Sequence, residues 1–217
     1  NKYRVQACKN YNANISFTVA EKAFEEVKDA EKQGYKFVHP FDGAHTLQGS
    51  ATLGLEIIDQ INDMDTKIDN VLISVGGGGL ISGVGAVLKQ IFPNINIIGI
   101  EPDEAKGITD SLKSNQPLQK VYINSIADSL CAPIHMPYSF SIAKQVIDEM
   151  FNITDKDMSE AMLFAYNQLK LFLEPACVAG FAALKKFQNK NFKGQNTLIL
   201  LCGSNIDFQS WNSIVNH

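Results

Sequence analysis

Apolar residues of this chain fall in short runs that are separated by stretches of helical periodicity. Residues 69–75, 96–100 and 197–201 are mainly apolar and lack the alternation of a half-exposed strand. Residues 52–61 and 80–92 carry their apolar side chains on one helical face. Apolar strands joined by helices are typical of a parallel sheet that is covered on both faces. The pattern therefore predicts an α/β fold with an open, mostly parallel, twisted sheet and helices on both faces.

The remaining elements are predicted from weaker patterns. Residues 14–19 and 35–38 are short β-rich runs, and residues 20–33 between them have helical periodicity. Three further helices are predicted in the second half, over residues 139–151, 154–171 and 175–187. The pattern breaks around residues 40–49 without hairpin chemistry. We therefore expect a domain crossing there, with the end of a smaller α/β domain at 1–42 and a large domain at 43–217.

Composition and charge narrow the function classes. The chain has 217 residues, 45% hydrophobic and 19% charged, with a formal net charge of −4. It has no basic stripe with interleaved aromatic residues, so a nucleic-acid partner is not expected. The longest apolar stretch, 71–88, is broken by six glycines and predicts a strand, turn and helix rather than a membrane span. Four cysteines without a C-x-x-C pair indicate reduced thiols and a cytoplasmic protein.

A glycine turn joins the strand at 69–75 to the helix that follows. Residues 74–83 read S-V-G-G-G-G-L-I-S-G. The carboxyl end of a strand in an open α/β sheet is where such folds bind ligands. Four residues without Cβ atoms let backbone N–H groups approach an anion, and the helix dipole adds to the attraction. No Lys-Ser/Thr pair follows, which excludes a nucleotide P-loop, and we favour a phosphate site over a turn that needs glycine for backbone reasons only.

Further short motifs accompany the glycine turn in a fixed order. They are I-E-P at 100–102, L-E-P at 173–175, L-C-G-S-N-I-D at 201–207 and F-V-H-P-F-D at 37–42. Together these motifs resemble the threonine and serine dehydratases, pyridoxal-phosphate enzymes of the tryptophan-synthase β-like fold (fold type II), with serine racemase as a close relative. The resemblance covers nearly the whole chain. It implies that the anion at the glycine turn is the phosphate of pyridoxal 5'-phosphate.

The resemblance implies which residues hold the cofactor. The phosphate would be bound by the glycine turn and the N–H of Leu80, that is by Gly76, Gly77, Gly78, Gly79 and Leu80. Cys202 falls where the family places a Ser, Thr or Cys beside the pyridine nitrogen. A thiol does not force protonation of that nitrogen, unlike a carboxylate, and this suits a β-elimination. The alternative for Cys202 is a small buried residue at a strand end.

Two more cofactor-site residues follow from the same resemblance. Glu174 falls at the family's Glu-Pro position near the ring, and a carboxylate at a helix start is an equal alternative. Ser129 replaces a family glycine whose carbonyl lies near the cofactor, a backbone contact that survives the exchange.

A cation site is also implied, at Glu101 and the carbonyl of Ala105, where some relatives bind a monovalent or divalent ion. The third ligand there is usually an acid, and this chain has Gly107 at that position. Hard cations need several oxygen ligands, and Asp103 or Glu104 would have to compensate. The alternative for Glu101 is a satisfied carboxylate at a strand end.

The family's Schiff-base lysine belongs to an S-x-K-x-R-G-like motif that does not occur in these residues. We therefore nominate no catalytic residue and expect the chain to be incomplete, with a large domain that lacks its N-terminal portion. The implied activity is the deamination of L-threonine or L-serine by β-elimination, to a 2-oxo acid and ammonia. The alternatives are a serine racemase-like enzyme and a non-catalytic fragment that binds pyridoxal phosphate or another anion. A homo-oligomer acting on a small amino acid, without nucleic acid or membrane partners, is expected by analogy.

Overall fold

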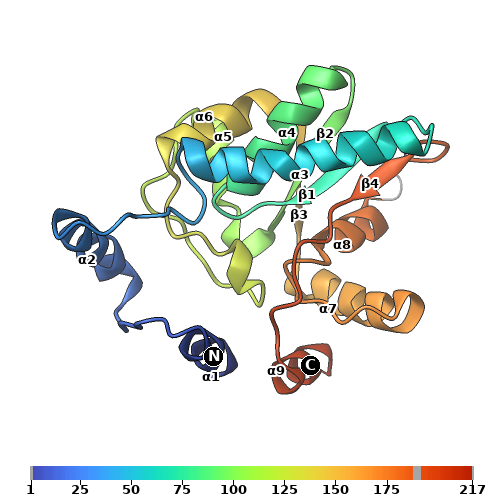
Figure 1. Cartoon of the computed structure of the whole chain (residues 1–217). Coiled ribbons are helices and arrows are strands. Elements are labelled where there is room, and N and C mark those ends of the chain that lie inside the picture. Colours follow the sequence, from blue (N-terminus) through green and yellow to red (C-terminus); the bar gives the residue numbers. More distant parts are fainter. Residues whose placement is uncertain (1, 188–191, 217) are drawn as a thin grey trace.

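The centre of the molecule is a four-stranded parallel sheet (Figure 1). The computed structural model describes residues 2–187 and 192–216, apart from the side chains of residues 20, 21 and 24. In spatial order the strands are β3 (Glu149–Ile153), β2 (Asn96–Pro102), β1 (Asn70–Ser74) and β4 (Thr197–Ile199). The predicted parallel α/β fold is confirmed.

Helices cover both faces of this sheet. Besides two N-terminal helices they are α3 (Ala44–Asp63), α4 (Gly79–Ile91), α5 (Gly107–Ser114), α6 (Pro137–Val146), α7 (Asp155–Phe164), α8 (Ala179–Lys186) and α9 (Phe208–Val215). Short 3-10 helices η1 (Asp103–Ala105) and η2 (Asp128–Leu130) and a π-helix η3 (Ala165–Leu169) interrupt the loops.

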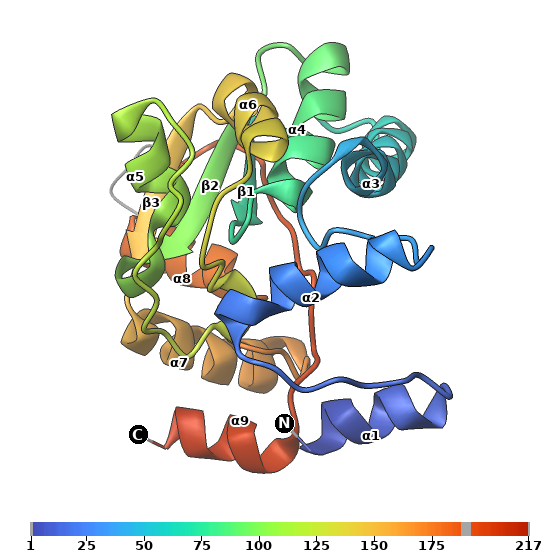
Figure 2. The same cartoon turned by 90° about the vertical axis from the view of Figure 1, so that its left-hand side faces the viewer.

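Alternate residues of β1 pack into two separate hydrophobic clusters. Val71 and Ile73 join the cluster formed with α3, α4 and α6, whereas Leu72 joins the cluster formed with α7 and α8. All five residues of β1 are buried, so the strand is covered on both faces, as its unbroken apolar run predicts. Figures 1 and 2 show α3 and α4 on one side of the sheet and α7 and α8 on the other.

Residues 2–42 lie outside these layers. Helices α1 (Lys2–Asn10) and α2 (Ala20–Lys32) are connected by an extended segment and stand apart from the sheet (Figures 1 and 2). The helix predicted at 20–33 is confirmed. The strands predicted at 14–19 and 35–38 are wrong, because these residues pair with no other strand of the described chain.

Three predicted helices in the second half need correction. The predicted helix at 139–151 ends at Val146, because the residues after it leave the helix and form β3 beside β2. The predicted helix at 154–171 ends as an α-helix at Phe164 and continues as η3 up to Leu169. The predicted helix at 175–187 begins only at Ala179, after a turn.

The described helices include none that is both long enough and apolar enough to cross a bilayer. The four cysteines are all free thiols.

Candidate functional site

A pocket of about 560 Å³ opens at the carboxyl end of β1. This is the edge of a parallel sheet at which α/β folds bind ligands. The structure brings all of the sequence-predicted cofactor positions to its wall, namely Gly76, Gly77, Gly78, Gly79, Leu80, Ser129, Glu174 and Cys202. Glu101 and Ala105, the two predicted cation positions, are not part of this wall.

The glycine turn presents an open helix N-terminus to the pocket. Gly78 has φ +89° and is the N-cap of α4, and no side chain of the described residues caps this helix. The left-handed conformation explains why a glycine is needed at this position. The first N–H groups of an α-helix have no acceptor within the helix. The turn therefore offers unpaired backbone donors and the positive end of a helix dipole to a ligand in the pocket.

Phe41 gives two other glycines of the turn a packing reason. A Cβ atom on Gly77 would lie 2.1 Å from Cγ of Phe41, and one on Gly79 would lie 2.7 Å from the carbonyl oxygen of Phe41. Phe41 also lines the pocket and stacks edge-on against His39, with ring centroids 4.6 Å apart. The glycines are thus needed for close packing as well as for the open backbone. Apart from the motif that contains Phe41, no sequence pattern predicts this contact.

Glu174 is a buried carboxylate in the pocket wall, with 7% of its surface exposed. Its Oε1 accepts a hydrogen bond from Oγ of Ser129 at 2.9 Å, and its Oε2 accepts one from the N–H of Asn205 at 3.0 Å. It does not start a helix, since α8 begins at Ala179. The helix-start interpretation of this residue is therefore wrong, and the carboxylate belongs to the pocket.

Cys202 follows β4 and carries a neutral thiol. Its side chain is open to the pocket, yet the protein atoms around it desolvate the sulfur. This desolvation, with the neighbouring Cys177 and Glu174 adding smaller effects, raises the pKa of Cys202 to about 11. The thiol therefore stays protonated at neutral pH and adds no negative charge to the pocket.

Arg4 closes the pocket wall from the N-terminal segment, and sequence reasoning missed it. Its Nη1 pairs with Oδ2 of Asp128 at 2.7 Å, and its Nη2 donates to the carbonyl oxygen of Asn205 at 2.7 Å. Both partners lie next to the donors of Glu174: Asp128 precedes Ser129, and Asn205 itself donates its N–H to Glu174. Arg4 stands in α1, a helix of nine residues that the sequence pattern did not predict and whose described residues include none that is buried. Arg4 therefore connects α1 to the two loops at the carboxyl edge of the sheet.

Glu101 is fully buried at the end of β2 and binds the N-terminus of α5. Its Oε1 accepts from the N–H of Ile108 at 2.7 Å, and its Oε2 accepts from the N–H of Thr109 at 2.9 Å and from Oγ1 of Thr109 at 2.8 Å. Burial raises its pKa to about 7, although these hydrogen bonds act in the opposite direction. Both carboxylate oxygens are thus engaged by protein donors, which favours the satisfied-carboxylate interpretation.

Gly107 lies beneath a buried histidine. A Cβ atom on Gly107 would lie 2.5 Å from Nε2 of His135, which is 1% exposed. Burial lowers the pKa of His135 to about 4, so its imidazole is neutral at physiological pH. An acidic side chain at position 107 therefore has no space, and the described residues contain no group of three or more His, Cys, Asp or Glu side chains that could hold a metal ion.

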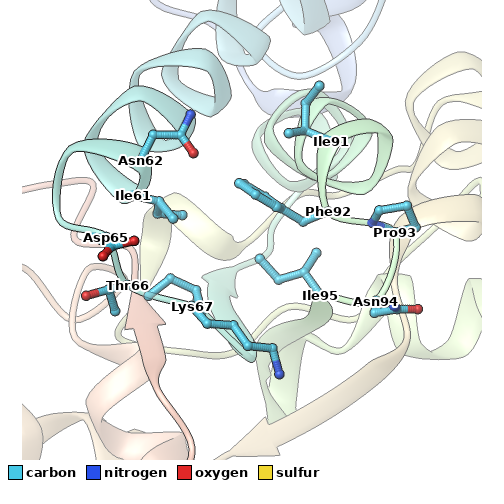
Figure 3. A pocket seen from close by; sticks show the side chains of 11 residues that line it. Ile61, Asn62, Asp65, Thr66, Lys67, Ile91, Phe92, Pro93, Asn94 and Ile95 are labelled. Carbon is cyan, nitrogen blue, oxygen red and sulfur yellow. The ribbon is translucent and has the colours of Figure 1, made fainter.

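A second hollow, of about 640 Å³, lies at the opposite end of the sheet (Figure 3). Its apolar base is formed by residues that precede β1 and β2 or end α3 and α4, namely Ile61, Ile68, Ile91, Phe92 and Ile95. The polar residues at its rim include Lys67, which already pairs with Asp69 at 2.5 Å. It contains none of the convergent polar groups that mark the glycine-turn pocket. We therefore assign the chemistry to the smaller pocket at the carboxyl edge.

Comparison with known proteins finds similar sequences along nearly the whole chain. A profile of the pyridoxal-phosphate dependent enzymes matches residues 1–203. Over 206 residues the chain is 36% identical to phenylserine dehydratase of Ralstonia pickettii. This alignment covers 94% of the chain and 62% of the dehydratase. It is 30% identical over 213 residues to L-threonine ammonia-lyase of Thermotoga maritima, covering 96% of this chain and 52% of that protein.

Solved structures give the same result. The processed form of threonine deaminase isoform 2 from Solanum lycopersicum superposes with a TM-score of 0.88 at 28% identity, over all of this chain and 63% of that one. Serine racemase from Dictyostelium discoideum superposes with a TM-score of 0.83 at 27% identity, over 96% of this chain and 66% of that one. The chain thus spans between about half and two thirds of the length of these relatives.

Proposed function

Because this chain belongs to the family of pyridoxal-phosphate dependent enzymes, we propose that it serves the elimination of water from a β-hydroxy α-amino acid. The products would be a 2-oxo acid and ammonia, with L-threonine or L-serine as substrate. The observation that carries the proposal is the uncapped N-terminus of α4, which faces a pocket also lined by Glu174 and Cys202. The relatives named as a threonine ammonia-lyase and a phenylserine dehydratase support the same reaction type.

The residues present fit pyridoxal phosphate. The N–H groups of the glycine turn and of Leu80 would bind the phosphate, since they are unpaired and lie at the positive end of α4. The pocket, of about 560 Å³, is in the range of cofactor sites. When bound, the cofactor supplies an electron sink for the substrate carbon that loses its proton.

The side chains of the pocket would set the chemistry of the ring. Cys202 presents a neutral thiol, as its raised pKa requires, and a neutral partner does not force a proton onto a ring nitrogen. Glu174 supplies a fixed acceptor for a donor of the bound ligand. Phe41 and Leu130 add apolar side chains to the pocket wall. No lysine is among the described residues that line the pocket, so we assign the covalent attachment of the cofactor to none of them.

Serine racemase-like activity is the second candidate. The structural similarity to a serine racemase supports it, and the pocket residues discussed above suit both reactions. A non-catalytic protein that binds the cofactor or another anion is the third candidate. Product analysis separates these three possibilities.

Several finer features also belong to the proposal. We propose a small domain that ends at residue 42, because none of the described side chains of residues 2–42 is buried. Exposed apolar side chains on α7 and η3, including Phe164, Tyr166 and Leu169, support a homo-oligomer.

Free cysteines support a cytoplasmic enzyme of amino-acid metabolism. A cation at Glu101 and Ala105 stays a prediction, and it requires Glu101 to exchange its protein donors for the ion.

The phosphate site is tested with Gly78→Asp. The new carboxylate would place a negative charge at the N-terminus of α4 and repel a phosphate, and Asp is among the residues that tolerate a positive φ. We expect the affinity for pyridoxal phosphate, measured by fluorescence titration, to fall by about tenfold or more. Gly34→Asp is the matched control, because Gly34 has φ +93° with nothing within 4 Å of its Cβ position. Equal affinity in both variants would contradict the site.

The reaction is tested by its products. We expect the holoenzyme to form 2-oxobutyrate from L-threonine or pyruvate from L-serine. Formation of D-serine without a 2-oxo acid would favour the racemase, and cofactor binding without either product would favour the non-catalytic protein.

A further inference from the structure

Glu174 is held in an unusual way for a buried carboxylate. None of the ion pairs formed by the described residues involves it, so its charge is supported by hydrogen bonds. One donor is the backbone N–H of Asn205 and the other is the hydroxyl of Ser129. A buried carboxylate that loses such a donor is strongly destabilised in its position. The Ser129 hydroxyl is therefore the one side-chain group, among the described contacts, that sets the orientation of Glu174.

The surroundings of Glu174 leave it little freedom on its other sides. A Cβ atom on Gly203 would lie 2.8 Å from Oε1 of Glu174, so the carboxylate rests against the backbone of residue 203. A carboxylate can accept about four hydrogen bonds, and two acceptor sites are filled here. Because Glu174 lines the pocket, a ligand there would be within reach of the acceptor sites that Ser129 and Asn205 leave unfilled.

The single proton of the Ser129 hydroxyl has two acceptors within reach. Glu174 Oε1 lies at 2.9 Å and Oδ1 of Asp128 lies at 3.4 Å, so the bond to Glu174 is the shorter. Arg4 holds the other oxygen of Asp128 at 2.7 Å and partly neutralises that carboxylate. Arg4 thereby favours donation from Ser129 to Glu174. It also binds the carbonyl of Asn205, whose N–H is the second donor to Glu174.

We propose that Ser129 is a positioning residue of the reaction: its hydroxyl holds the Glu174 carboxylate so that the open acceptor sites meet an N–H or O–H group of the bound substrate and cofactor. The inference rests on the proposed function, because it needs a ligand in this pocket. The proposed role belongs to the Ser129 side chain, whereas the family resemblance implies only that the backbone carbonyl of residue 129 lies near the cofactor. Ser129 itself is exposed, so its hydroxyl contributes little to the core.

The test compares Ser129→Ala with Ser129→Thr in the holoenzyme. The alanine variant loses the donor, and we expect kcat to fall about tenfold while KM changes less than about twofold. The threonine variant keeps a hydroxyl and is expected to restore kcat to within about threefold of the unchanged protein. The absorbance spectrum of the bound cofactor should shift in the alanine variant and return in the threonine variant.

A double-mutant cycle shows whether Ser129 acts through Glu174. In a Glu174→Ala background the Ser129→Ala change should have no further effect on kcat, because the group that it positions is gone. Ser125→Ala is the matched control. Ser125 lies on the same loop and donates to the carboxylate of Asp155 at 2.5 Å, outside the pocket. We expect it to leave kcat unchanged within about twofold even if it lowers the melting temperature.

The failures of the two proposals are distinguishable. An unchanged protein that binds no cofactor or forms no product overturns the proposed function. A fully active protein whose kcat is the same with alanine or serine at position 129 overturns the positioning role. A loss of kcat that persists in the Glu174→Ala background overturns it as well, since Ser129 would then act by another route.

Discussion

The N-terminal segment, residues 2–42, and the sheet with its covering helices, residues 43–187 and 192–216, differ most in burial. None of the described side chains of the segment is buried, and Tyr11 and Phe17 are 87% and 75% exposed. In the sheet, every residue of β1 is buried. Both regions contain helices, so helix formation is not the difference. An isolated helix as short as α1 is only marginally stable in water, and most helices in proteins gain their stability from packing, which this segment largely lacks.

Strand formation shows the same contrast. Residues 14–19 are β-rich but unpaired, whereas Glu149–Ile153 form β3 although their sequence pattern predicts the end of a helix. The second run lies beside β2 and exchanges hydrogen bonds with it, whereas no strand of the described residues lies beside the first. The propensity for a strand is therefore realised only where a neighbouring strand is available.

The largest expected effect distinguishes a core residue from an exposed one. Ile98→Ala removes a side chain that is 1% exposed, and we expect it to lower the free energy of unfolding by about 4 kcal/mol. Tyr11→Ala removes a larger side chain that is 87% exposed, and we expect a change within about 0.5 kcal/mol. Urea denaturation measures both. A loss of about 2 kcal/mol or more in Tyr11→Ala would break the comparison.

Gly83 in α4 and Gly49 in α3 differ in how closely other atoms approach them. A Cβ atom on Gly83 would lie 2.1 Å from Oγ of Ser50 and 2.5 Å from the carbonyl oxygen of Leu47. Gly83→Ala should therefore separate α4 from α3 and cost about 3 kcal/mol of stability. Gly49→Ala is the control, because its Cβ would meet nothing within 4 Å. It should stabilise α3 by about 0.5–1 kcal/mol. Similar denaturation midpoints for the two variants would contradict this packing.

The buried imidazole of His135 makes the larger region sensitive to acid. Its pKa is lowered from 6.5 to about 4 by burial, so the unfolded chain takes up a proton that the folded chain excludes. Above pH 6.5 the imidazole is neutral in both states, so its titration does not reduce stability. As the pH falls from 6.5 to about 4, only the unfolded chain is protonated at this residue, and we expect the free energy of unfolding to fall by roughly 2–3 kcal/mol.

His135→Gln is the control for this pH dependence. It removes the titrating group, so its free energy of unfolding should fall less steeply over the same pH range, whatever its absolute stability. Parallel pH profiles for the two proteins would exclude His135 as the cause.

The smallest effect concerns the connection between the two regions. Arg4→Ala removes the ion pair with Asp128 and the bonds to the Asn205 carbonyl. Because the Arg4 and Asp128 side chains are 35% and 64% exposed, we expect at most about 1 kcal/mol of global stability to be lost. Hydrogen exchange of α1 should nevertheless accelerate clearly. Lys9→Ala, at the exposed end of the same helix, should not change it.

The sequence pattern predicted three of the four described strands, whereas three helices of the second half differ from their predicted bounds. The apolar runs at 69–75, 96–100 and 197–201 contain β1, β2 and β4. An apolar run without alternation favours a strand that helices cover on both faces, and this holds for the buried β1 and β2, whereas β4 is only half-buried. β3 was missed, because its residues Glu149 and Asn152 interrupt the apolar pattern. Its position is set by pairing with β2, which the local sequence does not encode.

The residues of the candidate site also fall into those that local sequence motifs predict and those that they do not. The glycine turn, Glu174 and Cys202 were found through short motifs that adjoin strands or turns. Arg4 and Phe41 were missed, since each reaches the pocket from a segment far away in the sequence. The hydrogen bond from Ser129 to Glu174 likewise joins two positions 45 residues apart, and no local pattern predicts such a contact.

The pairing of β1 with β4 has a consequence for synthesis on the ribosome. Asn70 in β1 and Thr197 in β4 are partners that lie 127 residues apart in the chain. At typical translation rates, roughly 6–25 seconds pass between the appearance of the two residues. During this time one hydrogen-bonding edge of β1, the strand that carries the glycine turn, lacks its final neighbour. We therefore expect this edge of a nascent chain to stay open to pairing with other strands until β4 has emerged.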